Sequence, residues 1–159
     1  MSSRLAAHIM TPKGTILPFK PKRAKAVPVE DGHVFNLGGR KVVVLSVPGH
    51  TRGSIALIDV MNRVMFTGDD INRSLWMQLP GCTTLREWMD GGRLLLELSR
   101  VYAAWGGHED GRLTPETMRR TYEMVELVEE QDNTFPPRTK VYPEENTTPN
   151  LVYNSCRKN

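Results

Sequence analysis

The sequence has only two cysteines, few aromatic residues and no long hydrophobic run. Cys82 and Cys156 are too few for a disulfide framework or a zinc ribbon, so a reducing compartment is favoured. No run approaches the roughly 18 apolar residues of a membrane-spanning helix. The first ten residues also lack the apolar core of a secretory signal. We therefore expect a cytoplasmic protein without a membrane partner, built as one domain with a sizeable core.

Positive charge is concentrated near the N-terminus. Residues 1–41 contain eight Lys or Arg against two acidic residues, a balance of +6 in a chain whose net charge is +3. A basic segment can attract nucleic acid, but Phe19 is the only aromatic residue between Lys13 and Lys25. We therefore expect no nucleic-acid binding, and interpret residues 1–32 as a basic, proline-rich arm. Its helix-breaking prolines are Pro12, Pro18, Pro21 and Pro28.

Hydrophobic patterning predicts several short strands. The run Lys41–Val47 is β-branched and apolar, which is typical of a buried strand. Two later runs on either side of Val60-Met61-Asn62 have the pattern of a hairpin. The predicted strands are residues 34–35, 41–47, 54–59, 63–67, 102–105 and 151–153.

Two helices are predicted from their start signals and their periodicity. Thr84 and Glu87 have the spacing of a capping box. The pair Gly91-Gly92 interrupts the helix that follows, so either a bend or two helices is expected there. Its apolar face comprises Leu85, Trp88, Met89, Leu95, Leu96 and Val101.

Thr114 and Pro115 begin the second helix as N-cap and first helical residue. Its inner face comprises Met118, Tyr122, Val125 and Val128. Alternating strands and helices predict an α/β domain over residues 33–135. Residues 136–159 then form a tail with one strand.

Three metal-capable side chains each lie beside glycine, just after a predicted strand. They are His50 in Pro-Gly-His-Thr-Arg-Gly-Ser, Asp69 in Thr-Gly-Asp-Asp, and His108 in Gly-Gly-His-Glu-Asp. They lie 19 and 39 residues apart, so only a fold that brings strand ends together can unite them. Imidazole and carboxylate are zinc ligands, and a catalytic zinc keeps one position open for water. Asp70 is an alternative donor; Asp69 is preferred because it directly follows Gly68.

These motifs, in this order, closely resemble those of the metallo-β-lactamase-fold hydrolases, the glyoxalase II-like superfamily. The resemblance implies the C-terminal portion of an αβ/βα sandwich, with a mixed sheet and outer helices. It also implies two zinc ions, with His50 binding the first, Asp69 bridging both in a catalytic role, and His108 binding the second. The implied reaction is attack by a metal-bound hydroxide on a small-molecule ester, thioester, lactam or phosphodiester.

The family's first motif, H-x-H-x-D-H, is absent. His8 is the only histidine before Pro18, and its neighbours do not match that motif. Three ligands divided between two metals make a weak site, so we expect weak or no activity from this chain alone. The alternative is a non-catalytic fragment or pseudoenzyme that acts as a binding or assembly module.

The missing portion also predicts an uncovered sheet face. Val42, Val44, Ile55 and Leu57, or the alternate residues of the same strands, would face the place of the family's first sheet, and exposing them would favour association. The expected partners are a second copy of the chain, forming a homodimer, or a complementary polypeptide.

Further residues near the motifs have two interpretations each. The segment Trp76–Pro80 resembles a substrate-pocket loop, which makes Trp76 a candidate substrate-binding residue; the alternative is core packing. Asp70, Glu109 and Asp110 either orient metal ligands or are solvated loop residues. Cys82 has no basic neighbour to activate it and is interpreted as a small apolar residue.

Overall fold

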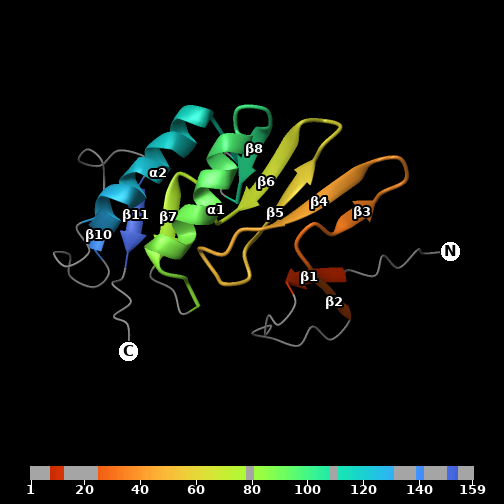
Figure 1. Ribbon diagram of the computed structural model, residues 1–159, viewed down its shortest axis with the longest axis horizontal. Coiled ribbons are helices and arrows are strands. Elements are labelled where there is room, and N and C mark those ends of the chain that lie inside the picture. Colours follow the sequence, from red (N-terminus) through yellow and green to blue (C-terminus); the bar gives the residue numbers. More distant parts are fainter. Residues whose placement is uncertain are drawn as a thin grey trace.

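The computed structural model describes residues 8–12, 25–77, 81–107, 111–130, 139–141 and 150–153 (Figure 1). In chain order, the elements in these ranges are β1 (His8–Pro12), β2 (Lys25–Val29), β3 (Val34–Asn36), β4 (Lys41–Ser46), β5 (Ile55–Asp59), β6 (Val64–Gly68), β7 (Ser74–Met77), α1 (Leu85–Leu98), β8 (Ala103–Gly106), β9 (Arg112–Leu113), α2 (Pro115–Glu130), β10 (Thr139–Val141) and β11 (Asn150–Tyr153).

The main sheet has six strands in the order β3-β4-β5-β6-β8-β9. All neighbours are antiparallel except β6 and β8, which are parallel, so the sheet is mixed. The α/β prediction is confirmed, as is the hairpin formed by β5 and β6. β9 was not predicted, because two residues are too short to show a strand pattern.

The topology places the ends of three strands at one edge of this sheet. β4 and β6 are each antiparallel to β5 and so run in the same direction, and β8 is parallel to β6. Gly68 at the end of β6 is the register partner of Gly106 at the end of β8. The three sequence motifs leave the sheet from these ends.

Both helices pack on the same face of the main sheet, as Figure 1 shows. Side chains from β5, β6 and β8 form one hydrophobic core with the inner faces of α1 and α2. Its members include Ala56, Ile58, Met65, Ala104, Trp88, Leu95, Met118 and Val125. The helices also contact each other directly: the Arg86 guanidinium pairs with Glu129 at 2.6 Å, and Arg93 donates to the Tyr122 hydroxyl.

The capping box predicted for α1 is present. Thr84 Oγ1 accepts from the Glu87 backbone N–H at 3.2 Å, and Glu87 accepts from the Thr84 backbone N–H at 2.9 Å. The helix continues through Gly91-Gly92 without a break. The two glycines permit close packing, since a Cβ at Gly92 would press on the Trp88 ring and one at Gly91 on the Val47 backbone. The predicted apolar face was wrong at Val101, which lies beyond the helix and is exposed.

The N-terminal cap predicted for α2 is also present, since Thr114 Oγ1 accepts from the Thr117 backbone N–H at 3.0 Å. All four residues predicted for its inner face are buried: Met118, Tyr122, Val125 and Val128.

The face of the main sheet opposite the helices is partly bare. Phe66 in β6 and Trp105 in β8 are register partners on this face, 47% and 41% exposed. The predicted exposure of Val44 is wrong, because residues 31–33 fold back along this end of β4. Asp31 accepts from the Ser46 backbone N–H at 2.7 Å, and the Gly32 N–H donates to the Val44 carbonyl at 2.9 Å.

Two smaller sheets flank the main one. β1 and β2 pair in parallel, where only an extended connection was expected. Pro28 is tolerated in β2 because that strand has a single partner among the described residues. β7 pairs in parallel with β11, which confirms the predicted tail strand, and β10 completes that sheet. Neither helix in the described ranges is long and apolar enough to cross a membrane.

Gly92 gives a direct test of the packing between α1 and the core. In Gly92→Ala the new Cβ would lie 2.8 Å from Trp88 Cη2. The fully buried ring has no room to retreat, so overpacking of about 1–3 kcal/mol should outweigh the gain of roughly 1 kcal/mol in helix propensity.

We expect a net loss of up to about 2 kcal/mol in the free energy of unfolding, measured by urea denaturation. Leu94→Ala, on the exposed side of the same helix, is the control and should change stability little. A Gly92→Ala protein as stable as the parent would show that the ring can move.

Candidate functional site at the edge of the main sheet

The loop after β4 is a compact turn that presents His50. The Val47 N–H donates to the Ser54 carbonyl at 3.0 Å, and the Gly49 N–H donates to the Thr51 carbonyl at 2.9 Å. Ser54 Oγ accepts from the Thr51 N–H at 3.0 Å. These bonds satisfy the turn's own polar groups, so the loop has a defined shape without a ligand.

The His50 ring is oriented by a backbone carbonyl. Its Nδ1 lies 2.7 Å from the Trp76 carbonyl oxygen. A carbonyl only accepts hydrogen bonds, so Nδ1 is assigned as the donor and Nε2 is the ring nitrogen left for a ligand. Ligating histidines in metalloproteins are typically held in this manner.

Asp69 is an exposed residue at the end of β6. It follows Gly68, whose φ of 55° lies in the left-handed region that glycine adopts readily. Its carboxylate lies against Gly107, where an added Cβ would collide with Asp69 Oδ1. The Gly107 N–H donates to the Gly68 carbonyl at 2.8 Å, which joins the two strand ends. Asp69 therefore lies beside the residue that precedes His108.

His108, Glu109 and Asp110 lie outside the described residues, as do the positions of Leu79 and Pro80. The segment's two flanks meet at the sheet edge, where the Gly106 N–H donates to the Gly111 carbonyl at 2.5 Å. The convergence of His50, Asp69 and His108 therefore stays a prediction.

Asp70 differs sharply from its exposed neighbour. It is 1% exposed, and its Oδ1 accepts from the His50 backbone N–H at 2.9 Å. Its Oδ2 has no hydrogen-bond partner among the described residues. Burial raises the pKa of the Asp70 carboxyl from 3.8 to about 7, while hydrogen bonds from the His50 N–H and the Ser54 hydroxyl act in the opposite direction. Of the two acidic residues, Asp69 thus has the more accessible carboxylate for a ligand.

Trp76 lies in β7 and is not a core residue. Its neighbours Leu75 and Met77 are buried, whereas Trp76 is 45% exposed, so the core-packing interpretation is wrong. Its carbonyl orients His50, and this backbone contact left no signal in the sequence. Its role in binding a substrate stays a prediction. Cys82 lies in the hydrophobic core, as expected.

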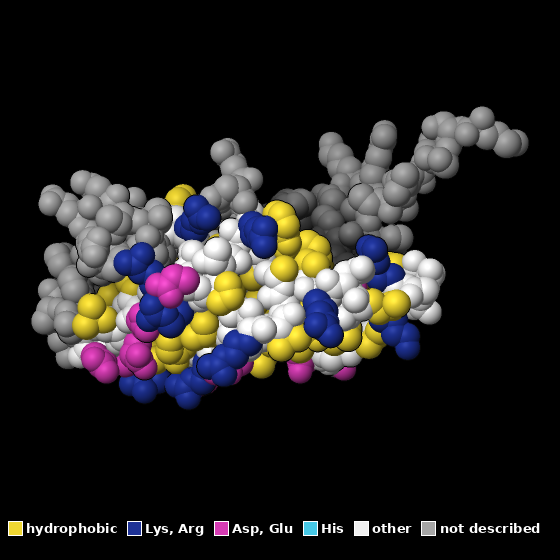
Figure 2. All heavy atoms as spheres, turned by 90° about the horizontal axis from the view of Figure 1, so that it is seen from above, with side chains coloured by type: hydrophobic (Ala, Val, Ile, Leu, Met, Phe, Trp, Pro, Cys, Tyr) yellow, Lys and Arg dark blue, Asp and Glu magenta, His cyan; other side chains and the backbone are white. Residues whose placement is uncertain are grey.

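The described ranges contain two donors suited to a metal, His50 and Asp69, at the same sheet edge. They contain no group of three or more His, Cys, Asp or Glu side chains arranged to hold an ion. His50 and Asp69 fit part of a metal site in chemistry and exposure. Figure 2 shows Lys and Arg side chains scattered over one side of the molecule among hydrophobic and acidic ones, with no single basic patch on the described part of that side.

Comparison with known proteins finds short sequence matches. The acyl-coenzyme A thioesterase MBLAC2 of Homo sapiens is 49% identical over 41 residues, 26% of this chain and 15% of that protein. The same enzyme of Gallus gallus is 38% identical over 64 residues, 40% of this chain and 20% of that protein. The chain thus spans no more than a fifth of these relatives. No protein-family model matches it.

Solved structures match a larger part of the chain. ETHE1 from Myxococcus xanthus has a TM-score of 0.56 and 23% identity, covering 70% of this chain and 54% of its own. The metallo-beta-lactamase family protein TTHA1429 from Thermus thermophilus has a TM-score of 0.55 and 22% identity, covering 68% and 36%. TTHA1623 in a di-iron-bound form has a TM-score of 0.50 and 29% identity, covering 61% and 47%.

The buried Asp70 carboxyl predicts a pH dependence of stability in the metal-free chain. Between pH 3.8 and about 7 the unfolded chain loses this proton before the folded chain does. The free energy of unfolding should therefore fall as pH rises through this window. Asp70→Asn does not ionise, so it should gain stability relative to the parent, by up to about 4 kcal/mol.

Urea denaturation at several pH values, with a chelator present, measures this difference. Asp69→Asn removes an exposed carboxylate next in the chain and is the control; its difference from the parent should vary little with pH. A pH-independent difference between Asp70→Asn and the parent would contradict the burial of a neutral carboxyl.

Proposed function

We propose that this chain, which has part of the metallo-β-lactamase fold, carries one portion of the active site of a metal-dependent hydrolase. His50, Asp69 and His108 are the proposed ligands, and zinc is the proposed metal. Asp69 is the proposed bridge between two ions and the catalytic carboxylate.

The observation that carries this proposal is the state of the His50 ring. Its Nδ1–H is donated to the Trp76 carbonyl, so Nε2 is the ring nitrogen left to bind a metal at this edge of the sheet. Ligating histidines almost always donate their other ring N–H to a carbonyl, carboxylate or water in this way. Asp69 supplies carboxylate oxygen at the same edge, and a catalytic zinc is commonly bound by this combination.

A bound zinc ion supplies Lewis-acid polarisation of a substrate oxygen and lowers the pKa of water. The chain's own residues hold and orient the ligands: the Trp76 carbonyl fixes the His50 ring, and the Gly68–Gly107 contact fixes the position of Asp69. The half-exposed side chain of Trp76, whose carbonyl contacts His50, is the proposed surface for the substrate's apolar part. No protein nucleophile is required.

Among esters, thioesters, lactams and phosphodiesters, we favour a thioester as substrate. The curated relatives with local identity to this chain are acyl-coenzyme A thioesterases. The exposed aromatic side chain of Trp76, in the strand whose carbonyl contacts His50, would suit the acyl chain of such a substrate. Because the chain matches only a small part of those enzymes, we expect little turnover from it in isolation.

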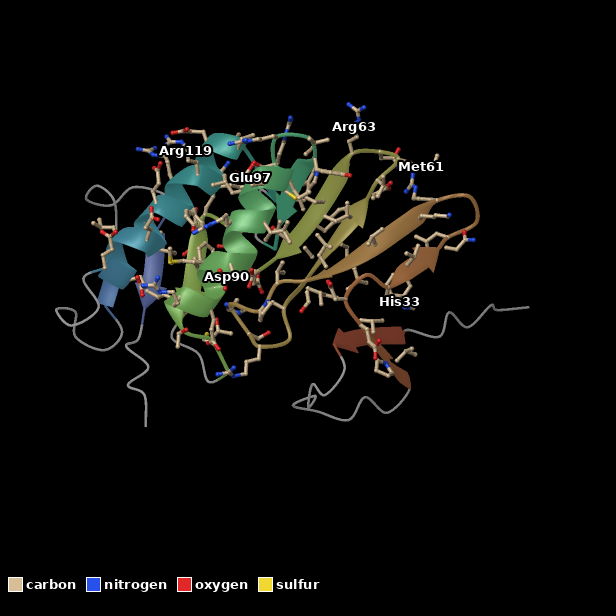
Figure 3. The ribbon with its side chains drawn as sticks, in the orientation of Figure 1. His33, Met61, Arg63, Asp90, Glu97 and Arg119 are labelled. Carbon is tan, nitrogen blue, oxygen red and sulfur yellow. The ribbon has the colours of Figure 1, made fainter. Side chains whose placement is uncertain are left out.

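Zinc binding tests the site. His50→Ala and Asp69→Asn each remove a proposed ligand, and we expect zinc affinity to fall by at least about 10–100-fold, the range for losses in a supporting shell. Competition against a chromophoric chelator measures it. His33→Ala is the matched control, since His33 is a second loop histidine, exposed and lying beside β3 (Figure 3).

Unchanged zinc affinity in both ligand variants would contradict the proposed site. Hydrolysis of an acyl-coenzyme A is measured in parallel. Turnover should be weak or absent; strong turnover that a chelator abolishes and zinc restores would contradict the expected dependence on a missing portion.

The second candidate function is a binding or assembly module, and the bare face of the main sheet supports it. Phe66 and Trp105 lie side by side on adjacent strands, and both rings are substantially exposed. Burying large aromatic side chains stabilises association, at roughly 25 cal/mol per Å² of apolar surface. We propose that this face binds a second apolar surface, either in a homodimer or on a complementary polypeptide.

Sedimentation at micromolar concentration tests this candidate. We expect the parent to associate and the double variant Phe66→Ser/Trp105→Ser to be monomeric. Leu94→Ser/Leu127→Ser removes two exposed apolar residues from the helices and is the control, which should associate like the parent. A compact monomer with cooperative unfolding, formed by the unaltered chain, would contradict the prediction.

A further inference from the structure

We propose that Asp70 is a positioning residue: through its hydrogen bond to the His50 backbone it holds the His50 ring in the orientation that presents Nε2. The effect of Asp70 on metal binding rests on the function proposed above. Its effect on the geometry of His50 does not, because the contact joins two groups of the protein itself.

Asp70 ties together three segments that are distant in the sequence. Its Oδ1 accepts from the His50 N–H at 2.9 Å, in the loop after β4. Its backbone carbonyl accepts from Trp88 Nε1 at 2.6 Å, which links it to α1. Its own N–H donates to the Thr67 carbonyl at 3.2 Å, which anchors it to the end of β6. The residue therefore joins the loop that bears His50 to the most buried part of the core.

The fit around this contact is close. A Cβ at Gly49 would collide with both Asp70 Oδ1 and Trp88 Cδ1, so the loop backbone passes directly over the carboxylate and the indole. Thr83 adds a second tie, since its N–H donates to the Gly49 carbonyl at 2.9 Å. The backbone of residues 49 and 50 is thus fixed from the side of the core.

Two anchors then determine the His50 ring. Asp70 fixes the backbone end of the residue, and the Trp76 carbonyl fixes Nδ1 at the other end. With both ends bonded, few side-chain torsions of His50 remain compatible with the structure. If the backbone anchor is removed, the loop can shift and the bond to Trp76 loses its geometry, since hydrogen bonds weaken steeply with misalignment.

Direct metal ligation by Asp70 is the alternative, and burial disfavours it. The residue lies beneath the loop with almost no exposed surface, whereas Asp69 is exposed. A ligand role would need the charged carboxylate, whereas a positioning role needs only an acceptor oxygen. Asp70→Asn separates the two, because the amide keeps an oxygen and loses the charge.

The experiment compares Asp70→Ala with Asp70→Asn in the metal-free full chain, using nitrogen-15 NMR. Two quantities are read: the exchange rate of the His50 backbone amide and the tautomer of the His50 ring. Zinc affinity of the same proteins is then measured by competition with a chromophoric chelator.

Asp59→Ala is the matched control. Asp59 is a second buried acidic residue whose Oδ1 accepts a backbone N–H, that of Asn62, at 3.1 Å. It lies next to the hairpin tip marked by Met61 and Arg63 in Figure 3, at the sheet edge opposite the candidate site. Its loss should lower stability without altering His50.

We expect the His50 amide to be protected in the parent and in Asp70→Asn, and to exchange at least about tenfold faster in Asp70→Ala. The ring should be the Nδ1–H tautomer in the first two proteins and a mixture in the third. Zinc affinity should fall about 10–100-fold in Asp70→Ala alone.

Three outcomes would overturn the proposal. They are an unprotected His50 amide in the parent, an unchanged tautomer in Asp70→Ala, and a loss of zinc affinity in Asp70→Asn as large as in Asp70→Ala. Protection of the His50 amide is measured on the unaltered chain, so this outcome tests the proposal even if Asp70→Ala fails to fold. If no protein binds zinc, the proposed function fails, while the amide and tautomer measurements still decide the role of Asp70.

Discussion

The burial of the Trp88 indole determines much of the rest of this structure. The ring is fully buried, packs near Tyr122 of α2 with centroids 6.0 Å apart, and donates through Nε1 to the Asp70 carbonyl. One side chain thus joins both helices to the end of β6. A buried indole N–H requires a partner, so the helix can approach the sheet only where a free carbonyl meets the ring.

This constraint connects the core to the loop that bears His50. Gly49 passes over the Trp88 ring and the Asp70 carboxylate at a distance that leaves no room for a side chain. The loop that bears His50 therefore packs directly against the buried Trp88 ring. Substitutions at the candidate site should consequently alter the stability of the domain as well as the geometry of the site. Both should be measured for each variant.

Local patterns in the sequence were sufficient for most elements of the fold. The N-terminal caps of both helices, the hairpin and the strand Lys41–Ser46 follow from short-range physical rules, and the structure has them, although only Val44 of that strand is buried. The features that could not be predicted depend on contacts between distant segments. Residues 31–33 return along β4, and β7 pairs with the tail strand. Gly91-Gly92 permits close packing without breaking α1. At the site, Gly-His and Gly-Asp drew attention to His50 and Asp69. The roles of the Trp76 carbonyl and of Asp70 depend on distances between separate segments, which no local pattern encodes.

The contact between Asp69 and Gly107 has a consequence for engineering. A Cβ at position 107 would meet the tip of the exposed Asp69 side chain, so a substitution of Gly107 would require that carboxylate to move. Substitutions of Gly107 would therefore displace Asp69, the proposed metal ligand. Replacing Asp69 by a smaller donor residue would leave room for alanine or serine at position 107. Positions 69 and 107, at the ends of two adjacent strands, should therefore be varied together, because the size of the side chain at one limits the side chain that fits at the other.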